Sequence, residues 1–287
     1  MLDVNYSDLA IRLLDRLINE TLTFVNPLFE FFNHGVHDNQ VKIDKVYVNS
    51  YTASLSAKPL SSEKVFDIKR WMCISRPQYS KSCGISALVS CWNFLFSSLG
   101  NGLLKPITQE VALDHLGFKP PYNEIGFGSF TGNLTLKRWF MQLNAIFKVK
   151  GRFSYLYKPK GKNRTFISSE IALNSLKVGL KCSKTFFIYH CYNHYFCPIG
   201  YEITDKHPEH AYSNDICSEN YTWVLIGDTS KSNAPILCKQ WSEIDLDLNC
   251  EMPNFFNIRK SYEGIQTKKK CSRPGNNIHC IMKFSIL

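Results

Sequence analysis

Apolar residues in the first two thirds of the chain recur at helical spacing. Directly after Cys83, the residues Ile85, Leu88, Trp92 and Leu95 fall on one face of a helix. Thr108 is a suitable N-cap for the next such segment, because its hydroxyl can accept a bond from a free N–H group of the first turn. The same spacing predicts further helices at residues 7–32, 108–116, 133–147 and 169–180.

The pattern changes after residue 180 to short aromatic and β-branched runs separated by polar turns. Such runs are typical of strands. Helices followed by a mostly antiparallel sheet define the α+β class. The predicted strands lie at residues 185–191, 194–203, 222–228, 235–239 and 278–286.

A serine-rich stretch near residue 60 suggests a domain boundary. Residues 49–62 read NSYTASLSAKPLSS, a composition that favours a loop over a packed element. Before it stand the predicted helix at residues 7–32 and a short strand, KIDKVYV. We therefore expect an N-terminal helical segment with its linker at residues 1–62 and one domain at residues 63–287.

Composition then narrows the class of protein. The 287 residues, 44% of them hydrophobic, are enough for one sizeable core. Charged residues interrupt the start of the chain, so we expect no export signal there, and residues 84–104 are too polar for a membrane-spanning helix. The eleven cysteines form no spaced framework and are expected to be reduced thiols. We expect a protein of the cytoplasm, the nucleus or both, without membrane contact.

Cys83 stands where a polar loop becomes an apolar helix, in the stretch RPQYSKSCGISAL. The free N–H groups and partial positive charge at a helix start lower the pKa of a thiol and make it a stronger nucleophile. The backbone N–H of Cys83 can bind an oxyanion, and Gln78, five residues upstream, can add a side-chain donor. The stretch therefore predicts Cys83 as a nucleophile and Gln78 as an oxyanion residue.

A base for this cysteine is predicted at His194, which begins a strand after the turn at residues 192–193. Asp228 ends the next predicted strand. If the two strands pair as neighbours, the Asp228 carboxylate reaches the distal ring nitrogen of His194 and orients the ring. The chain order Cys, His, Asp, with Gln before Cys, is that of papain-like enzymes. The sequence therefore predicts a site of Cys83, His194 and Asp228.

Each of these residues also has an ordinary structural interpretation. Cysteines on apolar helices are commonly core residues, as we expect for Cys91. Histidines flanked by aromatic residues, such as His194, often only hydrogen-bond within a sheet, and Asp228 suits the start of a turn. Catalysis is favoured by the combination of chain order, placement on elements and the upstream glutamine.

A zinc site is the competing chemistry in the stretch HCYNHYFC. It offers His190, Cys191, His194 and Cys197 as ligands. On one continuous strand the histidines face one side and the cysteines the other, so the four side chains do not converge. We therefore expect no metal and no other cofactor.

Basic loops give the second functional hypothesis. Lysine and arginine outnumber aspartate and glutamate by 34 to 24, a net charge of +10, which favours acidic partners. Two loops, one from Lys158 to Arg164 and one from Lys268 to Arg273, are expected to contact phosphates if the protein binds nucleic acid. Their ordinary interpretation is solvated charge. The glycine-rich residues 126–132 lack the lysine of a phosphate-binding loop and predict a lid or a structural turn.

Four stretches of the sequence carry a resemblance to a known family, namely KRWMCISRPQYSKSCGISALVSCWNFL, PITQEVALDHLGFKPP, FTGNLTLKRWF and IYHCYNHYFCPIGYE. They closely resemble the BIVM family, the basic, immunoglobulin-like variable motif-containing proteins. The resemblance runs from about residue 66 to the C-terminal strand and does not cover the first sixty residues. It implies a basic protein of the nucleus and cytoplasm and names no activity.

More distantly, the segments around the four site residues are similar to those of bacteriocin-processing, papain-like peptidases. This similarity implies a papain-like fold, with the oxyanion, nucleophile, base and orienting roles at Gln78, Cys83, His194 and Asp228, in that order. The interval between Gln and Cys is one residue shorter here than is usual in those peptidases.

Together these features predict a papain-like thiol enzyme. His194 deprotonates Cys83, and the thiolate attacks the carbonyl of a peptide, isopeptide or thioester, with a peptide or a ubiquitin-like protein as substrate. Hydrolysis and acyl transfer both remain open. The alternative is a non-catalytic basic module that binds nucleic acid or an acidic protein.

Overall fold

The computed structural model describes residues 63–127, 132–210, 220–268 and 278–287. All of them lie in the unit that spans Leu60–Leu287. The helix and strand predicted within the first 62 residues lie outside the described residues. So do the middle of the glycine-rich stretch and all of the second basic loop except Lys268.

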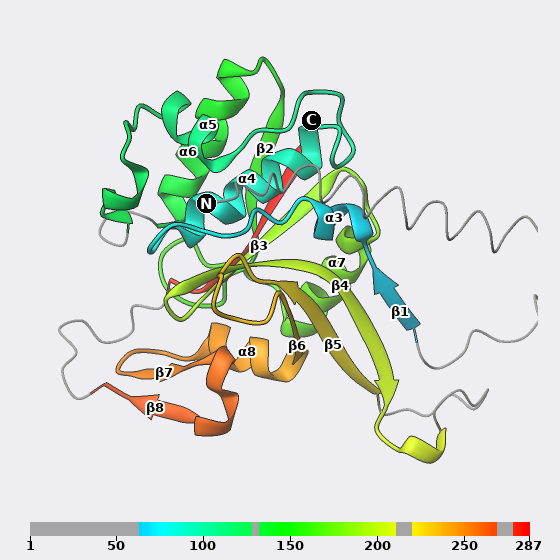
Figure 1. Cartoon of the computed structure of the whole chain (residues 1–287). Coiled ribbons are helices and arrows are strands. Elements are labelled where there is room, and N and C mark those ends of the chain that lie inside the picture. Colours follow the sequence, from blue (N-terminus) through cyan, green and yellow to red (C-terminus); the bar gives the residue numbers. More distant parts are fainter. Residues whose placement is uncertain (1–62, 128–131, 211–219, 269–277) are drawn as a thin grey trace, which may run out of the picture. The chain divides into compact units, whose positions relative to one another are not determined.

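The described residues form a mixed α+β domain built on one seven-stranded antiparallel sheet (Figure 1). The order across the sheet is β2-β9-β3-β4-β5-β6, and β1 pairs with the second half of β4. β7 (Asn254–Phe256) and β8 (Ile265–Thr267) form a separate hairpin. The strands of the large sheet are β1 (Glu63–Phe66), β2 (Gly151–Tyr157), β3 (Thr185–Cys191), β4 (His194–Asp205), β5 (Asn220–Gly227), β6 (Ile236–Gln240) and β9 (Cys280–Ile286).

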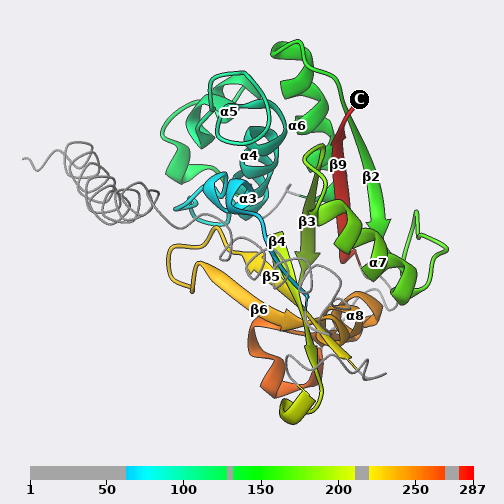
Figure 2. The same cartoon turned by 90° about the vertical axis from the view of Figure 1, so that its right-hand side faces the viewer.

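Helices pack on both faces of this sheet (Figure 2). One buried cluster joins one face to α4 (Cys83–Phe96), α5 (Gln109–His115) and α6 (Asn133–Ile146), and a second joins the other face to α7 (Ser169–Leu180) and α8 (Trp241–Asn249). No described helix is long and apolar enough to cross a membrane. The remaining helical segments are α3 (Ile68–Met72), η1 (Tyr122–Glu124), η3 (Pro208–His210) and η4 (Ile258–Glu263).

The predicted α+β class is confirmed, together with the helices α4 to α7 and the strands β3, β4, β5, β6 and β9. The prediction that all helices precede the sheet is wrong, because β2 lies between α6 and α7 in the chain and α8 follows β6. β2 is an edge strand, and its partner among the described strands, β9, comes more than a hundred residues later. The alternation of polar and aromatic residues in GRFSYLY is typical of a strand, but the prediction placed no strand between the helices.

Arg70, a residue of α3, is completely buried and ties α3 to the end of α7. Its Nη1 donates to the carbonyl of Thr185 at 2.7 Å, and its Nη2 donates to the carbonyls of Gly179 and Cys182 at 3.0 and 2.8 Å. Its Nε lies 3.0 Å from the Asp67 carboxylate. A helix end leaves carbonyls without intrahelical partners, and here a guanidinium satisfies them in the protein interior.

We expect Arg70→Met to lower the free energy of unfolding by about 3–5 kcal/mol, because it leaves buried carbonyls and the Asp67 carboxylate without their partner. Urea denaturation measures this. Arg152→Met, on the exposed side of β2, is the matched control and should change stability by less than about 0.5 kcal/mol. Equal effects of the two substitutions would contradict the role given to Arg70.

Candidate functional site

His194 and Asp228 are brought together by the pairing of β4 with β5. The turn at residues 192–193 reverses the chain, with Asn193 at a φ of 59°, a left-handed conformation that asparagine tolerates. β4 then begins at His194, and its antiparallel register with β5 places the end of β5 opposite this start. Nε2 of His194 lies 2.8 Å from Oδ1 of Asp228, and the two side chains are only 4% and 0% exposed. The predicted contact is present.

Asp228 is held as an ionised acceptor. Burial by itself raises the pKa of its carboxyl, but the hydrogen bonds from His194, the N–H of Ser230 and the amide of Asn233 outweigh this and lower the pKa below its ordinary value. The Ser230 N–H donates to Oδ1 at 2.9 Å, and the Asn233 amide donates to Oδ2 at 3.0 Å. An ionised carboxylate only accepts, so Nε2 of His194 carries a proton.

His194 is therefore a neutral imidazole with Nδ1 as its basic nitrogen. Burial lowers the pKa of the ring below its ordinary value, and the positive charge of Arg259 lowers it further, while the bond to Asp228 acts in the opposite direction. A neutral ring at pH 7 can accept a proton from a neighbouring acid. The ring at the start of β4 is thus in the protonation state that a general base requires.

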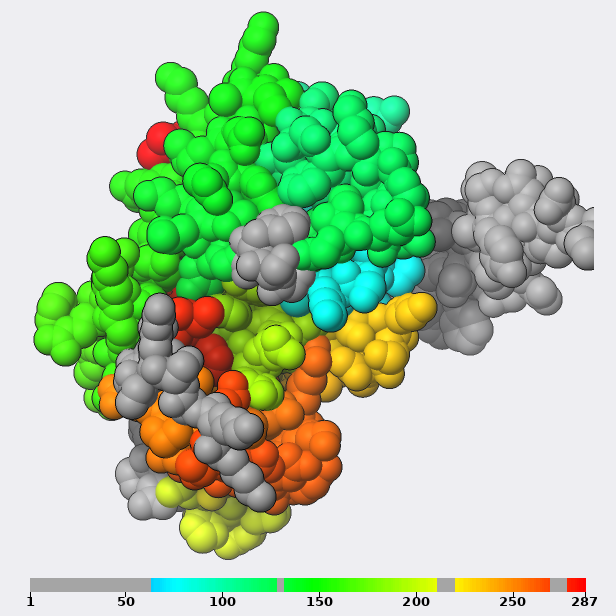
Figure 3. Space-filling model, turned by 90° about the vertical axis from the view of Figure 1, so that its left-hand side faces the viewer, coloured from blue at the N-terminus to red at the C-terminus, as the bar shows by residue number. Residues whose placement is uncertain are grey.

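Cys83 and His194 line one cavity of about 1100 Å³, together with Gln78. Figure 3 shows a face on which cyan and green segments lie above yellow-green, red and orange segments, and the residues that line the cavity come from these segments. The described residues form no hydrogen bond between the Cys83 and His194 side chains. The cavity joins segments that are far apart in the chain, because residues of the loop before α4, the β3–β4 turn and η4 all line it.

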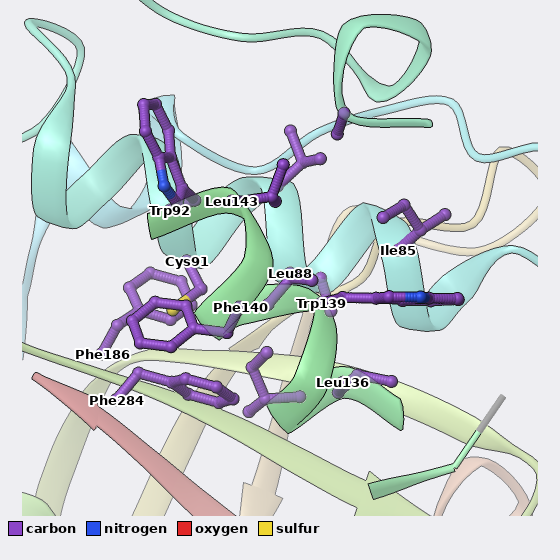
Figure 4. Close-up of a cluster of buried hydrophobic side chains, with 14 of the residues drawn as sticks. Ile85, Leu88, Cys91, Trp92, Leu136, Trp139, Phe140, Leu143, Phe186 and Phe284 are labelled. Atoms are coloured by element: carbon purple, nitrogen blue, oxygen red, sulfur yellow. The ribbon is translucent and has the colours of Figure 1, made fainter. Parts of the chain in front are cut away.

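The position of Cys83 is fixed by the burial of α4. Every residue of this helix after Cys83 is buried, and Cys91 is a core residue, as predicted. Figure 4 shows Ile85, Leu88 and Trp92 within the cluster to which α6 and the sheet contribute. Because the rest of α4 is packed, only its first residue reaches the cavity.

The thiol of Cys83 differs from the sequence prediction in its acidity. Burial raises its pKa, and the opposing effects of the Tyr195 N–H, the Arg259 charge and the N–H groups of Gly84 and Cys83 itself do not outweigh burial. The helix start does act in the predicted direction, but it acts on a poorly solvated sulfur. The cavity thus holds a neutral thiol and a neutral imidazole.

Gln78 is oriented by Thr229, the residue after Asp228. Its backbone N–H donates to the Thr229 carbonyl at 3.2 Å, and its Oε1 accepts from the Thr229 hydroxyl at 2.7 Å. This assigns the other end of the amide, Nε2, as the donor of a side chain that lines the cavity. The loop before α4 and the loop after β5 are also joined by Arg76, whose Nη1 donates to the Asp228 carbonyl at 3.0 Å.

Two residues at the site were not found from the sequence. Buried Gln109 accepts from the Ser86 hydroxyl at 2.6 Å and donates to the Pro77 carbonyl at 3.0 Å, so it fixes the Gln78 loop to α4. Arg259 lies 3.7 Å from the Asp228 carboxylate and also lines the cavity. Neither stands in a recognisable motif, and the contacts of both are to distant parts of the chain, so no local signal marks them.

The stretch HCYNHYFC forms a hairpin and not the continuous strand assumed in the zinc argument. Cys191 and Cys197 are buried, and no group of three or more potential ligands lies together among the described residues. His190 instead stacks on Tyr195 at 4.3 Å between ring centroids, and its Nδ1 lies 3.1 Å from the Ile278 carbonyl. Burial lowers the pKa of His190 to about 3, so its ring is neutral.

Fold and site together define a mixed α+β protein with an antiparallel sheet, in which a cysteine and an aspartate-bonded histidine line one cavity. The chain belongs to the family of basic immunoglobulin-like variable motif-containing proteins, whose family model matches residues 59–287. The family predicted from the sequence is thereby confirmed.

Curated relatives carry the same family name. The Xenopus laevis protein is 51% identical over 230 residues, and the Homo sapiens protein is 50% identical over 231 residues, in both cases 79% of this chain and 46% of the relative. A Giardia intestinalis relative is 28% identical over 225 residues, 70% of this chain and 80% of its own. The chain thus spans about half the length of the vertebrate relatives. No solved structure matches it significantly.

We expect the protein to lose stability as the pH falls from about 6.5 towards 3. In this window His190 binds a proton in the unfolded chain but stays neutral in the folded protein, because burial lowers the folded-state pKa of this ring to about 3. Protonation therefore stabilises the unfolded chain. One such group contributes a slope of up to about 1.4 kcal/mol per pH unit. Urea midpoints between pH 7 and 4 measure it.

His190→Phe keeps a ring against Tyr195 and should flatten this pH dependence by up to one proton's slope. His207→Phe, at an exposed position after β4, removes one imidazole without removing a buried one and is the control. An unchanged slope in the His190→Phe protein would show that His190 takes up a proton in the folded state.

Proposed function

We propose that the protein is a papain-like thiol hydrolase or acyltransferase acting on a peptide, isopeptide or thioester. The observation that carries the proposal is the buried 2.8 Å bond between His194 and Asp228 beside a cavity that Cys83 also lines. A peptide or a ubiquitin-like protein is the proposed substrate. The order of the residues and their placement at a helix start and on two neighbouring strands support the papain-like assignment.

In the proposed reaction, Nδ1 of His194 takes the thiol proton of Cys83 while the sulfur attacks the substrate carbonyl. The bond to Asp228 leaves Nδ1 as the basic nitrogen and stabilises the imidazolium that forms. The carbonyl oxygen becomes an oxyanion, for which the Cys83 N–H and Nε2 of Gln78 are the donors. The imidazolium then protonates the leaving amine or thiol, and an acyl thioester remains on Cys83.

The second half of the reaction releases the acyl group. Nδ1 of His194, neutral again, takes a proton from water or from an amine, which attacks the thioester carbonyl through a second oxyanion. Collapse of this oxyanion breaks the C–S bond, and the proton returns to Cys83. Water gives hydrolysis and an amine gives transfer, and the same residues serve both reactions.

A reducing compartment suits such a thiol, and we propose the cytoplasm, the nucleus or both. Support comes from the described cysteines, all nine of which are free thiols. Cys83 and Cys250 line the cavity, and Cys238 is exposed on β6. Oxidising surroundings favour disulfides between accessible thiols, whereas the proposed chemistry needs Cys83 reduced.

The alternative function, a non-catalytic module for nucleic acid or an acidic protein, is carried by the net charge of +10. The described part of the first basic loop supports it less than the sequence suggested. Lys158 is buried, and its ammonium donates to the carbonyls of Lys160 and Lys162. Lys160 lies 3.1 Å from the Glu251 carboxylate. Lys158 and Lys160 are thus engaged within the protein and are less available to bind phosphates. For this reason the thiol enzyme is the function we propose first.

We expect His194→Ala to slow alkylation of Cys83 by iodoacetamide at pH 7 by about 10²-fold, because a buried neutral thiol loses its base. Peptide mass spectrometry of timed samples measures the rate at each cysteine. Cys238, exposed in the same molecule, is the internal control and should react equally in both proteins. Equal rates at Cys83 in the two proteins would refute the proposed base.

We expect Gln78→Glu to slow acylation of Cys83 by p-nitrophenyl acetate by about 10²-fold, since one oxyanion donor becomes an acceptor. The nitrophenolate burst measures acylation. Glutamate keeps the acceptor that Thr229 binds, so the loop contact is preserved. Alkylation by iodoacetamide forms no oxyanion and serves as the control reaction. A parallel loss in both reactions would assign Gln78 a structural role instead.

A further inference from the structure

The cavity beside Cys83 is lined by side chains of one charge sign. Lys81, Arg259 and Lys268 face it, and no aspartate or glutamate stands among its described lining residues. The three cations come from separate segments, namely the loop before α4, the 3-10 segment η4 and the residue after β8. Cations from three distant parts of the chain thus converge on the cavity that holds Cys83.

The nearby carboxylates do not cancel this charge. Within the described ranges, neither Lys81 nor Lys268 has a salt bridge. Arg259 lies 3.7 Å from the ionised Asp228 carboxylate, which offsets part of its charge, whereas the charges of the two lysines are not offset in this way. The cavity therefore presents a net positive wall.

Lys268 is supported on an aromatic pair. The rings of Tyr192 and Phe255 stack with their centroids 4.6 Å apart, and the Lys268 ammonium lies 5.0 and 5.5 Å from the two centroids. Ring faces attract and position a cation without neutralising it. Tyr192 lies in the β3–β4 turn, two residues before His194. The Lys268 ammonium is therefore held over the turn that precedes the proposed base.

We propose that the acyl substrate of this site carries a carboxylate close to the reacting carbonyl, bound by Arg259, Lys81 and Lys268. The inference rests on the proposed function and names the substrate class. A cleft that is walled by protein and lined by charges of one sign attracts an anion more strongly than the same charges spread over an open surface. The planar guanidinium of Arg259 matches a carboxylate with two parallel donors, and the lysines add point charges.

Two small alkylating reagents of similar shape test the charge preference. Iodoacetate carries a carboxylate next to its reactive carbon, whereas iodoacetamide carries a neutral amide. The ratio of their rates at Cys83, divided by the same ratio at exposed Cys238, isolates the effect of the cavity. We expect this normalised ratio to be about 10 in the unmodified protein and to fall as salt is added, because ions screen the attraction.

Lys268→Gln should reduce the normalised ratio by about threefold, and the double variant Lys81→Gln/Lys268→Gln should bring it close to 1. Lys137→Gln is the matched control, since Lys137 also lies over an aromatic ring, that of Phe153 at 5.7 Å, but does not line the cavity. It should leave the ratio unchanged. Neither lysine variant touches the His194–Asp228 pair.

The outcomes separate this inference from the proposed function. A normalised ratio near 1, with alkylation by iodoacetamide still dependent on His194, overturns the carboxylate preference and leaves the thiol chemistry intact. Alkylation that does not depend on His194 refutes the proposed function itself. Protection of Cys83 by inorganic phosphate but not by succinate, at equal ionic strength, overturns the assignment of the anion as a carboxylate.

Discussion

The pairing of β4 with β5 is the constraint on which the site depends. β4 is the strand with the most neighbours in the sheet, because β1, β3 and β5 all hydrogen-bond to it, and its first eight residues are buried. A shift of this pairing by one residue would turn buried side chains towards the opposite face, so the core itself enforces the register. That register holds His194 at Asp228, so the contact between the two side chains is part of the fold itself.

The burial that positions the cysteine also determines its chemistry. α4 is packed along its whole length after Cys83, so the sulfur has a fixed place at the cavity wall. The same surroundings raise the pKa of the thiol, and they lower the pKa of His194. A helix start in open solvent would favour a free thiolate, whereas this one favours a neutral thiol, and the proposed reaction therefore moves the proton during attack. The burial that fixes the Cys83 sulfur at the cavity wall thus also keeps its thiol protonated.

Helices and strands with a strong local pattern were predictable, and single side chains that bond to distant parts of the chain were not. α4 to α7 and the strands β3 to β5 have strong periodic patterns, and the contact between His194 and Asp228 follows from the adjacency of their strands. Arg70 instead reaches a carbonyl 115 residues away. Local patterns carry no record of such contacts, so only the folded chain reveals them.

Arg259 connects the charge of the cavity with the reactivity of the base. Its positive charge lowers the pKa of both Cys83 and His194, and it lies beside Asp228. The two effects oppose each other, because a more acidic thiol assists attack while a weaker base hinders proton removal. A carboxylate bound to Arg259, as proposed, would offset this charge and restore basicity to His194 when substrate is present. Substrate charge would then act on the base as well as on binding, which couples recognition to the proton transfer that the neutral resting pair requires.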